Sequence, residues 1–282
     1  MSQTWLRHAP AKINLNLRIL GKRPDGFHEL ETFMVPISLA DELRFLKREE
    51  GIKMTCSDPS LPCDSTNLVW RAAELFLQTY YVKGGVEIHL EKRVPHGAGL
   101  GGGSSDAATV LRVLREMYQV EVSDEALADL SSQMGSDIPF FIYQRPAWCR
   151  GRGERIEPME IQGIYQGILV HPGFGVPTPW AYKTYAAAPA TGERGVDLGF
   201  IVLQNDLEPA VFSKYAWIPT VKKWFQSQTE VLDSMMSGSG SAVFALIKPG
   251  ENREAVLTRF RHAFGSEIFS VVFEFNPEKR EL

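Results

Sequence analysis

The glycines in the run VPHGAGLGGGSSD, which begins at Val94, are the residues with the clearest potential for chemistry. From Gly97 to Gly103 only Ala98 and Leu100 carry a Cβ atom, so the backbone can turn its N–H groups toward an anion. A helix that begins near Ser104 places a partial positive charge at its N-terminus, which favours a phosphate group there. The run therefore predicts a phosphate-binding loop, with serine hydroxyls available to phosphate oxygens or to Mg²⁺.

A dinucleotide-binding fingerprint is the sharpest alternative for this loop. Gly97, Gly99 and Gly102 satisfy the GxGxxG spacing, and Glu121 follows at about the expected distance. Against it, Pro95 interrupts the preceding strand, that strand alternates polar with apolar residues, and a long segment precedes it. The GxxxxGK[ST] motif of P-loop NTPases and the VAIK, HRD and DFG motifs of protein kinases do not occur. The fingerprint and a mobile surface loop stay open as alternatives.

The loop is expected to join a strand to a helix. Residues 86–91 alternate apolar with polar side chains, as in a strand with one buried face. After the loop, apolar residues recur at helical spacing from Ala107 to Met117, which predicts a helix that starts near Ser104. Another helix is expected over Leu68–Tyr81, because N-cap candidates fill the preceding segment Asp64–Asn67.

The N-terminal segment predicts a hairpin. Residues 13–18 alternate apolar and polar side chains, and Lys12 is expected at the head of this strand. Gly21–His28 carries a Pro-Asp-Gly turn signal before a second extended run, Glu31–Leu39. His28 is therefore expected just past the hairpin tip.

The second half of the chain has the pattern of a separate α+β unit. A helix capped by Ser123 is expected to end around Gly135, and the pattern changes beyond Pro158. A Pro-rich turn is expected at 172–179. The remaining elements are predicted as strands at 164–170, 241–247 and 268–275 and helices around 180–187, 218–226 and 251–264. We place the domain boundary near residue 160.

Composition bounds the partners of the protein. The 282 residues are 44% hydrophobic and 23% charged, which fits one large or two modest globular domains. A formal net charge of −4 and a pI near 5.9 provide no basic footprint, so nucleic acid and anionic membranes are poor candidate partners. No apolar run approaches the roughly eighteen residues of a membrane span, and MSQTWLRHAPAK lacks a secretory core. We expect a cytoplasmic location.

The cysteines argue against both a disulfide framework and a zinc site. Cys56, Cys63 and Cys149 are odd in number and include no CxxC spacing. This pattern indicates reduced structural thiols and no metal site built by the protein.

Separated motifs together resemble a known superfamily. PHGAGLGGGSSD resembles the ATP-binding motif of the galactokinase, homoserine kinase, mevalonate kinase and phosphomevalonate kinase superfamily, the GHMP kinases. SGSGSAVFAL, Ser237–Leu246, is similar to the C-terminal signature that packs against the nucleotide loop, although alone it is compatible with any hairpin turn. PAKINLNL, GKRPDGFHELET and GSDIPFF resemble the branch that phosphorylates 4-diphosphocytidyl-2-C-methyl-D-erythritol on the non-mevalonate route to isoprenoids. The resemblance runs from Pro10 to about Phe244.

The resemblance implies a two-domain α+β GHMP kinase fold with a cleft between the domains. Residues 1–160 are expected to form a ribosomal protein S5-like ATP-binding domain, and residues 161–282 a ferredoxin-like domain. ATP is expected as the donor, and Mg²⁺ is expected to arrive with it and keep much of its water. The nucleotide side is expected to comprise Pro95, Gly97, Gly99, Leu100, Gly101, Gly102, Gly103, Ser104, Ser105, Lys92, Asn67 and Leu68.

The resemblance also implies an acceptor side made of Asn14, Phe27, His28, Thr178 and Tyr182, with the rings of Phe27 and Tyr182 sandwiching the cytosine. The position of Phe27 is often tyrosine in the family, so stacking is retained while a phenolic hydrogen bond is lost. A neutral His28 ring could both donate and accept hydrogen bonds to a cytosine edge.

Lys12 and Asp137 are the expected catalytic pair. Phosphoryl transfer needs an aligned hydroxyl, neutralised charge and a destination for the proton. Asp137 beside Lys12 would stay ionised and could accept that proton, while Lys12 would stabilise the developing negative charge. The alternatives are a solvated strand-end lysine and a plain turn aspartate. His96 departs from the apolar residue of some family members, which affects the expected adenine wall.

Two other functions remain open from sequence. Another small-alcohol kinase of the homoserine or mevalonate type would not need DGFH or the ring of Tyr182. A non-catalytic nucleotide- or RNA-binding module on an S5-like fold would not need Lys12 together with Asp137, and the acidic pI speaks against it.

Overall fold

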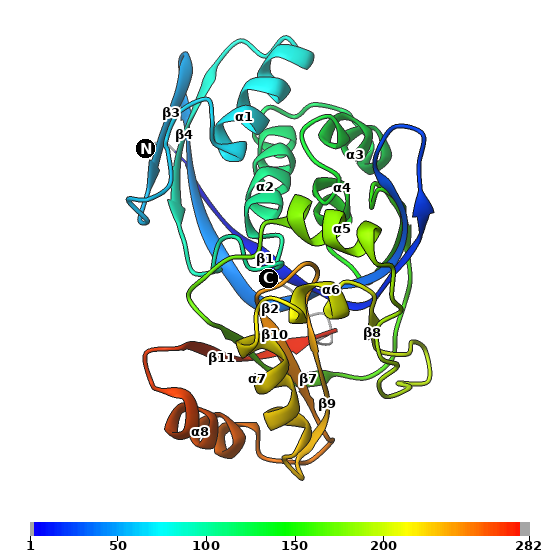
Figure 1. The fold of residues 1–282 in the computed structure, drawn as a ribbon. Helices are drawn as coiled ribbons and strands as arrows, with labels where there is room; N and C mark the ends of the chain where they lie inside the picture. The colour runs from blue at the N-terminus through cyan, green and yellow to red at the C-terminus, as the bar shows by residue number, and fades with distance from the viewer. Residues whose placement is uncertain (1–2, 277–282) are drawn as a thin grey trace.

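A long antiparallel hairpin of β1 (Thr4–Lys22) and β2 (His28–Arg48) runs through the fold (Figure 1). It belongs to residues 3–276, the part of the chain that the computed structural model describes. The predicted hairpin is confirmed, and Gly26 occupies its turn with a φ of 87°, which favours glycine. The expectation that Lys12 heads the strand was wrong. The strand starts at Thr4 because residues 4–10 pair with β2 up to Leu46, so Lys12 lies in its interior, beside a register shift.

Two sheets organise the described residues. The first has seven strands in the order β3-β4-β2-β1-β8, with β5 on β2 and β6 on β5; the second has four, in the order β11-β7-β10-β9. The strands not yet bounded are β3 (Gly51–Cys56), β4 (Gly85–Glu91), β5 (Ala147–Gly151), β6 (Arg155–Pro158), β7 (Tyr165–His171), β8 (Gln204–Asn205), β9 (Val231–Met236), β10 (Val243–Ile247) and β11 (Phe269–Phe275). Most pairs are antiparallel, while β3 with β4 and β1 with β8 are parallel.

Helices cover the first sheet on one side and flank the second (Figure 1). They are α1 (Leu68–Thr79), α2 (Gly102–Met117), α3 (Asp124–Ser132), α4 (Ile138–Tyr143), α5 (Thr178–Ala187), α6 (Glu208–Phe212), α7 (Trp217–Gln226) and α8 (Arg253–Phe264). The side chain of Asn67 caps α1 by accepting the backbone N–H of Val69, and Ser123 caps α3 in the same way. Two expected limits change: α2 starts at Gly102, before Ser104, and α3 ends at Ser132, before Gly135.

The hydrophobic core is continuous between the two halves of the chain. One buried cluster joins Ile13 and Phe33 of the first sheet to Leu169, Phe244 and Phe273 of the second. The expected α+β class is confirmed, with one sheet in each half of the fold. The exact limits at residues 160 and 161 stay a prediction.

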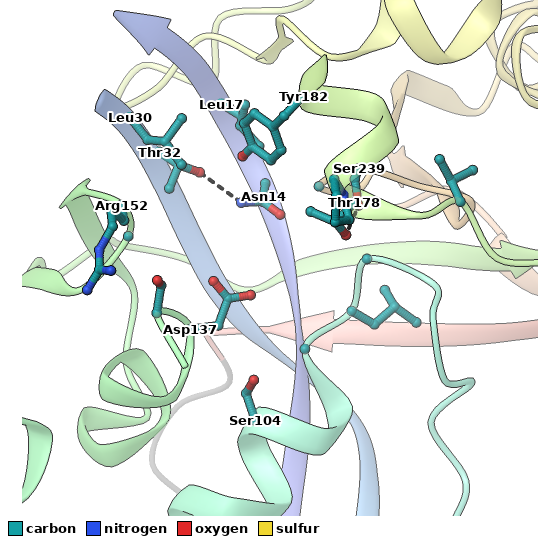
Figure 2. Close-up of a pocket in the computed structure, with 18 of the residues that line it drawn as sticks. Asn14, Leu17, Leu30, Thr32, Ser104, Asp137, Arg152, Thr178, Tyr182 and Ser239 are labelled. Atoms are coloured by element: carbon teal, nitrogen blue, oxygen red, sulfur yellow. Dashed lines mark hydrogen bonds between the residues drawn. The ribbon is translucent and has the colours of Figure 1, made fainter. Parts of the chain in front are cut away.

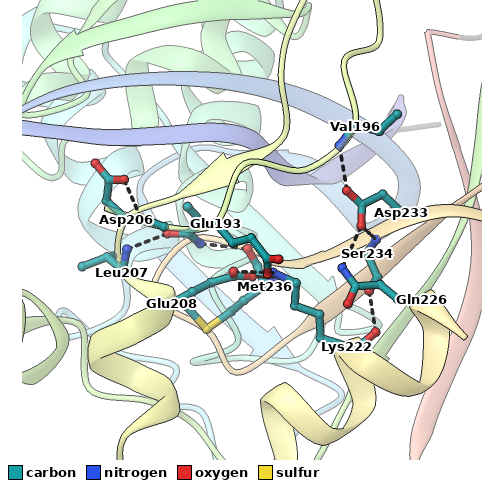
Figure 3. A network of polar contacts seen from close by, with 12 residues as sticks. Glu193, Val196, Asp206, Leu207, Glu208, Lys222, Gln226, Asp233, Ser234 and Met236 are labelled. Carbon is teal, nitrogen blue, oxygen red and sulfur yellow. Dashed lines mark hydrogen bonds and ion pairs between the residues drawn. The ribbon is translucent and has the colours of Figure 1, made fainter. Parts of the chain in front are cut away.

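The short strand β8 returns the chain from the second half to the first sheet. It pairs with β1, and the carboxylate of Asp206 then accepts the N–H groups of Ile19 and Gly192, each at 3.0 Å. Glu208 forms a buried ion pair with Lys222 at 2.6 Å and accepts the Met236 N–H at 2.9 Å (Figure 3). Burial raises the pKa of Glu208. This network fixes β9 and the turn that follows it against β1.

None of the helices within residues 3–276 has both the length and the hydrophobicity needed to cross a bilayer.

Candidate active site

A cavity of about 890 Å³ lies between the hairpin, the glycine loop, α5 and the turn after β9 (Figure 2). The continuous run from Pro95 to Ser104 lines one end of it, together with Leu68. The predicted catalytic residues Lys12 and Asp137 line the middle. The predicted acceptor residues that line the other end are Asn14, Phe27, His28, Thr178 and Tyr182. The structure therefore brings together motifs that lie far apart in the sequence.

The glycine loop is fastened to the second glycine-rich motif. The Ser237 hydroxyl donates to the Gly99 carbonyl at 3.0 Å, and the Ala242 N–H donates to the Ala98 carbonyl at 3.1 Å. Gly99 has a φ of 76°, and a Cβ there would lie 2.2 Å from the carbonyl oxygen of Ser237. Only glycine fits at this position, because any side chain would collide with the backbone of the second motif. The two hydrogen bonds confirm the expected packing of SGSGSA against the nucleotide loop.

The loop leads directly into α2, whose first turn faces the cavity. Gly101 takes the left-handed conformation before the helix, and its carbonyl accepts the Ser105 N–H in the first helical hydrogen bond. The unbonded N–H groups and the helix dipole favour an anion at this end. Ser104 points its hydroxyl toward the same space as Asp137 (Figure 2).

Lys12 is buried, with 4% of its surface exposed, and its ammonium group has well-defined partners. Nζ donates to Asn14 Oδ1 at 2.6 Å and to the Gly99 carbonyl at 2.8 Å. Burial lowers the pKa of Lys12, and the nearby carboxylate of Asp137 acts in the opposite direction. Because its close partners are uncharged oxygens, Lys12 retains positive potential toward the cavity.

Asp137 stands at the N-terminus of α4, beside Pro139, and its carboxylate is not used to cap that helix. Oδ1 would lie 3.7 Å from a Cβ at Gly153, so backbone borders it on one side. Its charge also acts on the half-buried side chain of Tyr182, whose pKa is raised mainly by desolvation and further by the charge of Asp137. A carboxylate at this place can accept a proton from a hydroxyl bound in the cavity.

The acceptor end holds a cluster of rings and hydrogen-bonding groups. His28 stacks on Tyr182 with ring centroids 5.4 Å apart and an interplanar angle of 26°. Asn14 Nδ2 donates to the Thr32 hydroxyl at 2.8 Å, and the hydroxyls of Thr178 and Ser239 lie 2.8 Å apart. Burial, followed by the charge of Lys22, lowers the pKa of His28, so the imidazole is neutral near pH 7.

Comparison with known proteins establishes the family to which this chain belongs. Residues 67–145 match the GHMP kinases N terminal domain, and residues 195–266 match the GHMP kinases C terminal domain. A 4-diphosphocytidyl-2-C-methyl-D-erythritol kinase from Methylacidiphilum infernorum is 49% identical over 252 residues, which cover 87% of each chain. This chain belongs to that kinase family. A second member, from Citrifermentans bemidjiense, is 38% identical across 85% of this chain and 88% of its own.

Solved structures agree with the family assignment. A crystal structure of 4-(cytidine 5′-diphospho)-2C-methyl-D-erythritol kinase superposes with a TM-score of 0.80 at 35% identity, covering 96% of this chain and 99% of that one. Homoserine kinase from Cytophaga hutchinsonii has a TM-score of 0.72 at 18% identity, covering 98% of this chain and 95% of its own, and shares the fold. The expected GHMP kinase fold, with its N- and C-terminal domains, is thus confirmed.

Three predicted nucleotide residues of this family member lie outside the cavity lining. Ser105 is fully buried in α2 and is not among the residues that line the cavity, and its hydroxyl has no hydrogen-bond partner within the described residues. Lys92 is held in a buried pair of salt bridges, to Asp41 at 2.5 Å and to Asp106 at 3.1 Å. The side chain of Asn67 caps α1, next to the cavity residue Leu68. Their roles toward a nucleotide stay predictions.

The expected cytosine sandwich is not preformed. Among the described rings, Tyr182 stacks with His28 and not with Phe27. Phe27 is 53% exposed, and the guanidinium of Arg152 lies over its ring. His96 does line the cavity beside the glycine loop, as its position suggested. A base that enters between Phe27 and Tyr182 must therefore displace or join existing stacking partners.

Asn205 is a supporting residue that sequence reasoning missed. It is fully buried, and its amide donates to the carbonyls of Met236 and Gly238 at 2.9 and 2.8 Å. A Cβ at Gly238 would lie 3.2 Å from Lys12 Nζ, so this turn borders Lys12. The polar pair Asn205-Asp206 was a possible sign of a structural role, but nothing near it in the sequence indicates a contact with Met236, 31 residues later.

We expect Asn205→Ala to destabilise the fold by about 1–3 kcal/mol, because two buried carbonyls lose their donor. It should also lower the activity of the folded fraction, because the turn beside Lys12 is released. Urea unfolding and steady-state kinetics measure the two effects separately. Gln226→Ala, which removes a 2.9 Å hydrogen bond to Asp233 away from the cavity, is the matched control. Full specific activity in folded Asn205→Ala would contradict this role for the turn.

Proposed function

We propose that this kinase transfers the γ-phosphoryl group of ATP to the 2-hydroxyl of 4-diphosphocytidyl-2-C-methyl-D-erythritol, a step in the formation of isoprenoid precursors. The observation that carries the proposal is a single cavity in which a glycine phosphate loop, Lys12 with Asp137, and a ring-lined acceptor end follow one another. The names of the relatives support the choice of acceptor over homoserine or mevalonate.

The nucleotide is proposed to bind at the glycine loop end. Backbone N–H groups between Pro95 and Ser104 and the positive end of α2 meet the phosphates, and the absence of side chains at Gly97 and Gly99 permits close approach. The Ser104 hydroxyl would suit an accompanying Mg²⁺, which would neutralise phosphate charge when bound.

Lys12 and Asp137 are proposed to share the chemical step. Asp137 accepts the proton of the attacking hydroxyl, and the oxygen of that hydroxyl forms a bond to the γ-phosphorus as the bond to the β-phosphate oxygen breaks. Lys12 stabilises the charge on the phosphoryl oxygens during transfer. The buried setting of Lys12 strengthens this effect because little water screens it.

The acceptor is proposed to lie between the rings and the turn after β9. Neutral His28 can donate one hydrogen bond and accept another, which suits a cytosine edge. Asn14, which accepts a hydrogen bond from Lys12, and Thr178, which contacts Ser239, are proposed to orient hydroxyl groups of the acceptor. ATP is abundant in the cytoplasm, where we propose that the enzyme works.

A coupled ADP-release assay with three acceptors tests the proposed function. The cytidyl acceptor should support turnover with a kcat/KM far above that of homoserine or mevalonate, because only it offers a base to the rings. The same assay on an Asp137→Asn preparation controls for contaminating kinases. Preferred turnover of homoserine or mevalonate would sink the proposal in favour of another GHMP kinase activity.

Asp137→Asn should lower kcat by about 10²–10⁴-fold, because the amide cannot accept the hydroxyl proton. The KM for ATP should change little, since the nucleotide binds mainly at the loop. Asp129→Asn makes the same chemical change on the exposed side of α3 and should retain full activity. Rapid-quench measurement of the first turnover shows whether the loss lies in the chemical step; an unchanged kcat would remove Asp137 from the mechanism.

The pH profile should report the lowered pKa of Lys12. Since burial makes this ammonium lose its proton more readily than an ordinary lysine, kcat/KM should fall on the alkaline side at a pH below 10.5. A bound polyanion favours the protonated form of Lys12. The alkaline fall in kcat, which reports the substrate-bound enzyme, should therefore lie at a higher pH than the fall in kcat/KM. Lys12→Arg, which stays charged, should lack both declines in whatever activity it retains. An identical alkaline limb in that variant would assign the titration to another group.

A further inference from the structure

Cationic side chains gather at the acceptor end of the cavity beyond those used in the mechanism. Lys22, Arg152 and Lys183 all line it, in addition to Lys12. Among the described lining residues, Asp137 is the one carboxylate. Lys22 pairs with His28 across the hairpin, and Lys183 follows Tyr182 on α5, so both flank the stacked rings. This end therefore suits an acceptor with several negative charges.

Arg152 has the most defined placement of these cations. Its guanidinium carbon lies 5.0 Å from the centroid of the Phe27 ring, and its side chain is 34% exposed. The Arg152 backbone N–H donates to the Glu154 carboxylate at 2.6 Å, while its Nε approaches that carboxylate only at 4.0 Å. The backbone is thus anchored and the guanidinium edge remains available. Figure 2 shows Arg152 on the same side of the cavity as Asp137.

We propose that Arg152, whose guanidinium lies over the Phe27 ring, binds the diphosphate group of the acceptor and is a specificity-determining residue of this kinase. The inference rests on the proposed function. A guanidinium presents N–H groups in a planar fork that matches two phosphate oxygens, and stacking on a ring restricts its motion before the ligand arrives. Lys22 and Lys183 add charge without that directional fit.

The position of Arg152 separates this role from nucleotide binding. The triphosphate has its own donors in the loop from Pro95 to Ser104, at the other end of the cavity. Phe27 offers its second face to the cytosine, so that one ring carries the cation on one side and the base on the other. A diphosphate joined to that base then lies within reach of the guanidinium. Acceptors such as homoserine and mevalonate carry no diphosphate and gain nothing from it.

Binding of cytidine 5′-diphosphate and of cytidine tests the proposal by calorimetry in the absence of ATP. Arg152→Met should weaken the diphosphate by about 10- to 100-fold and cytidine by less than about 3-fold. Arg152→Lys, which keeps the charge without the fork, should give an intermediate loss for the diphosphate. Arg150→Met is the matched control: Arg150 lies 5.6 Å from the ring of Trp148, outside the cavity lining, and its loss should change neither affinity.

Kinetics provide a second readout with the cytidyl acceptor. Arg152→Met should raise the KM for this acceptor while leaving the KM for ATP and the kcat near the wild-type values.

Equal losses for cytidine and its diphosphate, or a diphosphate affinity matching that of Arg150→Met, would overturn the inference. If the wild type turns over the cytidyl acceptor and Arg152→Met behaves like the wild type, this inference is rejected and the proposed function is retained. Failure of the wild type to use that acceptor rejects the proposed function, whereas the calorimetric comparison still judges Arg152. Thermal unfolding verifies that each variant is folded.

Discussion

The ammonium group of Lys12 is buried from water, and the active site depends on how that charge is stabilised. Removing an ammonium from water is costly unless its hydrogen bonds are replaced. Asn14 Oδ1 and the Gly99 carbonyl replace two of them, which ties β1 to the glycine loop. A carboxylate in direct contact would have neutralised the charge. Because the close partners are dipoles, the positive potential persists, and in the proposed mechanism a phosphate of the nucleotide completes the stabilisation.

Features with local causes could be predicted from the sequence. The turn at Gly26, the cap at Asn67 and the strand-to-helix setting of the glycine loop all follow from residues within a few positions of one another. The separated motifs also proved sufficient to place Lys12, Asp137 and the loop in one cavity, because their order along the chain resembles that of the family.

Features that depend on distant partners could not be predicted in this way. Lys12 was expected at a strand end, but the pairing of residues 4–10 with β2 extends the strand past it. Ser105 is buried in α2, and the elements that cover it are distant in the sequence and leave no local signal. Lys92 carries no local sign of its contacts, since Asp41 lies 51 residues before it. The strands β3, β5, β6 and β9 form in segments whose alternation of polar and apolar residues is short or interrupted. Pairing with neighbouring strands therefore determines that these segments are extended.

The return of the chain through β8 has a consequence for how such an enzyme can change over evolution. Residues that follow the nominal boundary complete the edge of the first sheet, and Asn205 and Asp206 hold both the turn beside Lys12 and the hairpin strand. The two halves are therefore not interchangeable modules. Recombination between two relatives at residue 160 would pair β8 from one relative with β1 from the other, although the two strands were not selected together. Acceptor preference in this architecture is thus expected to diverge by substitutions around the hairpin tip and α5, and not by exchange of whole domains.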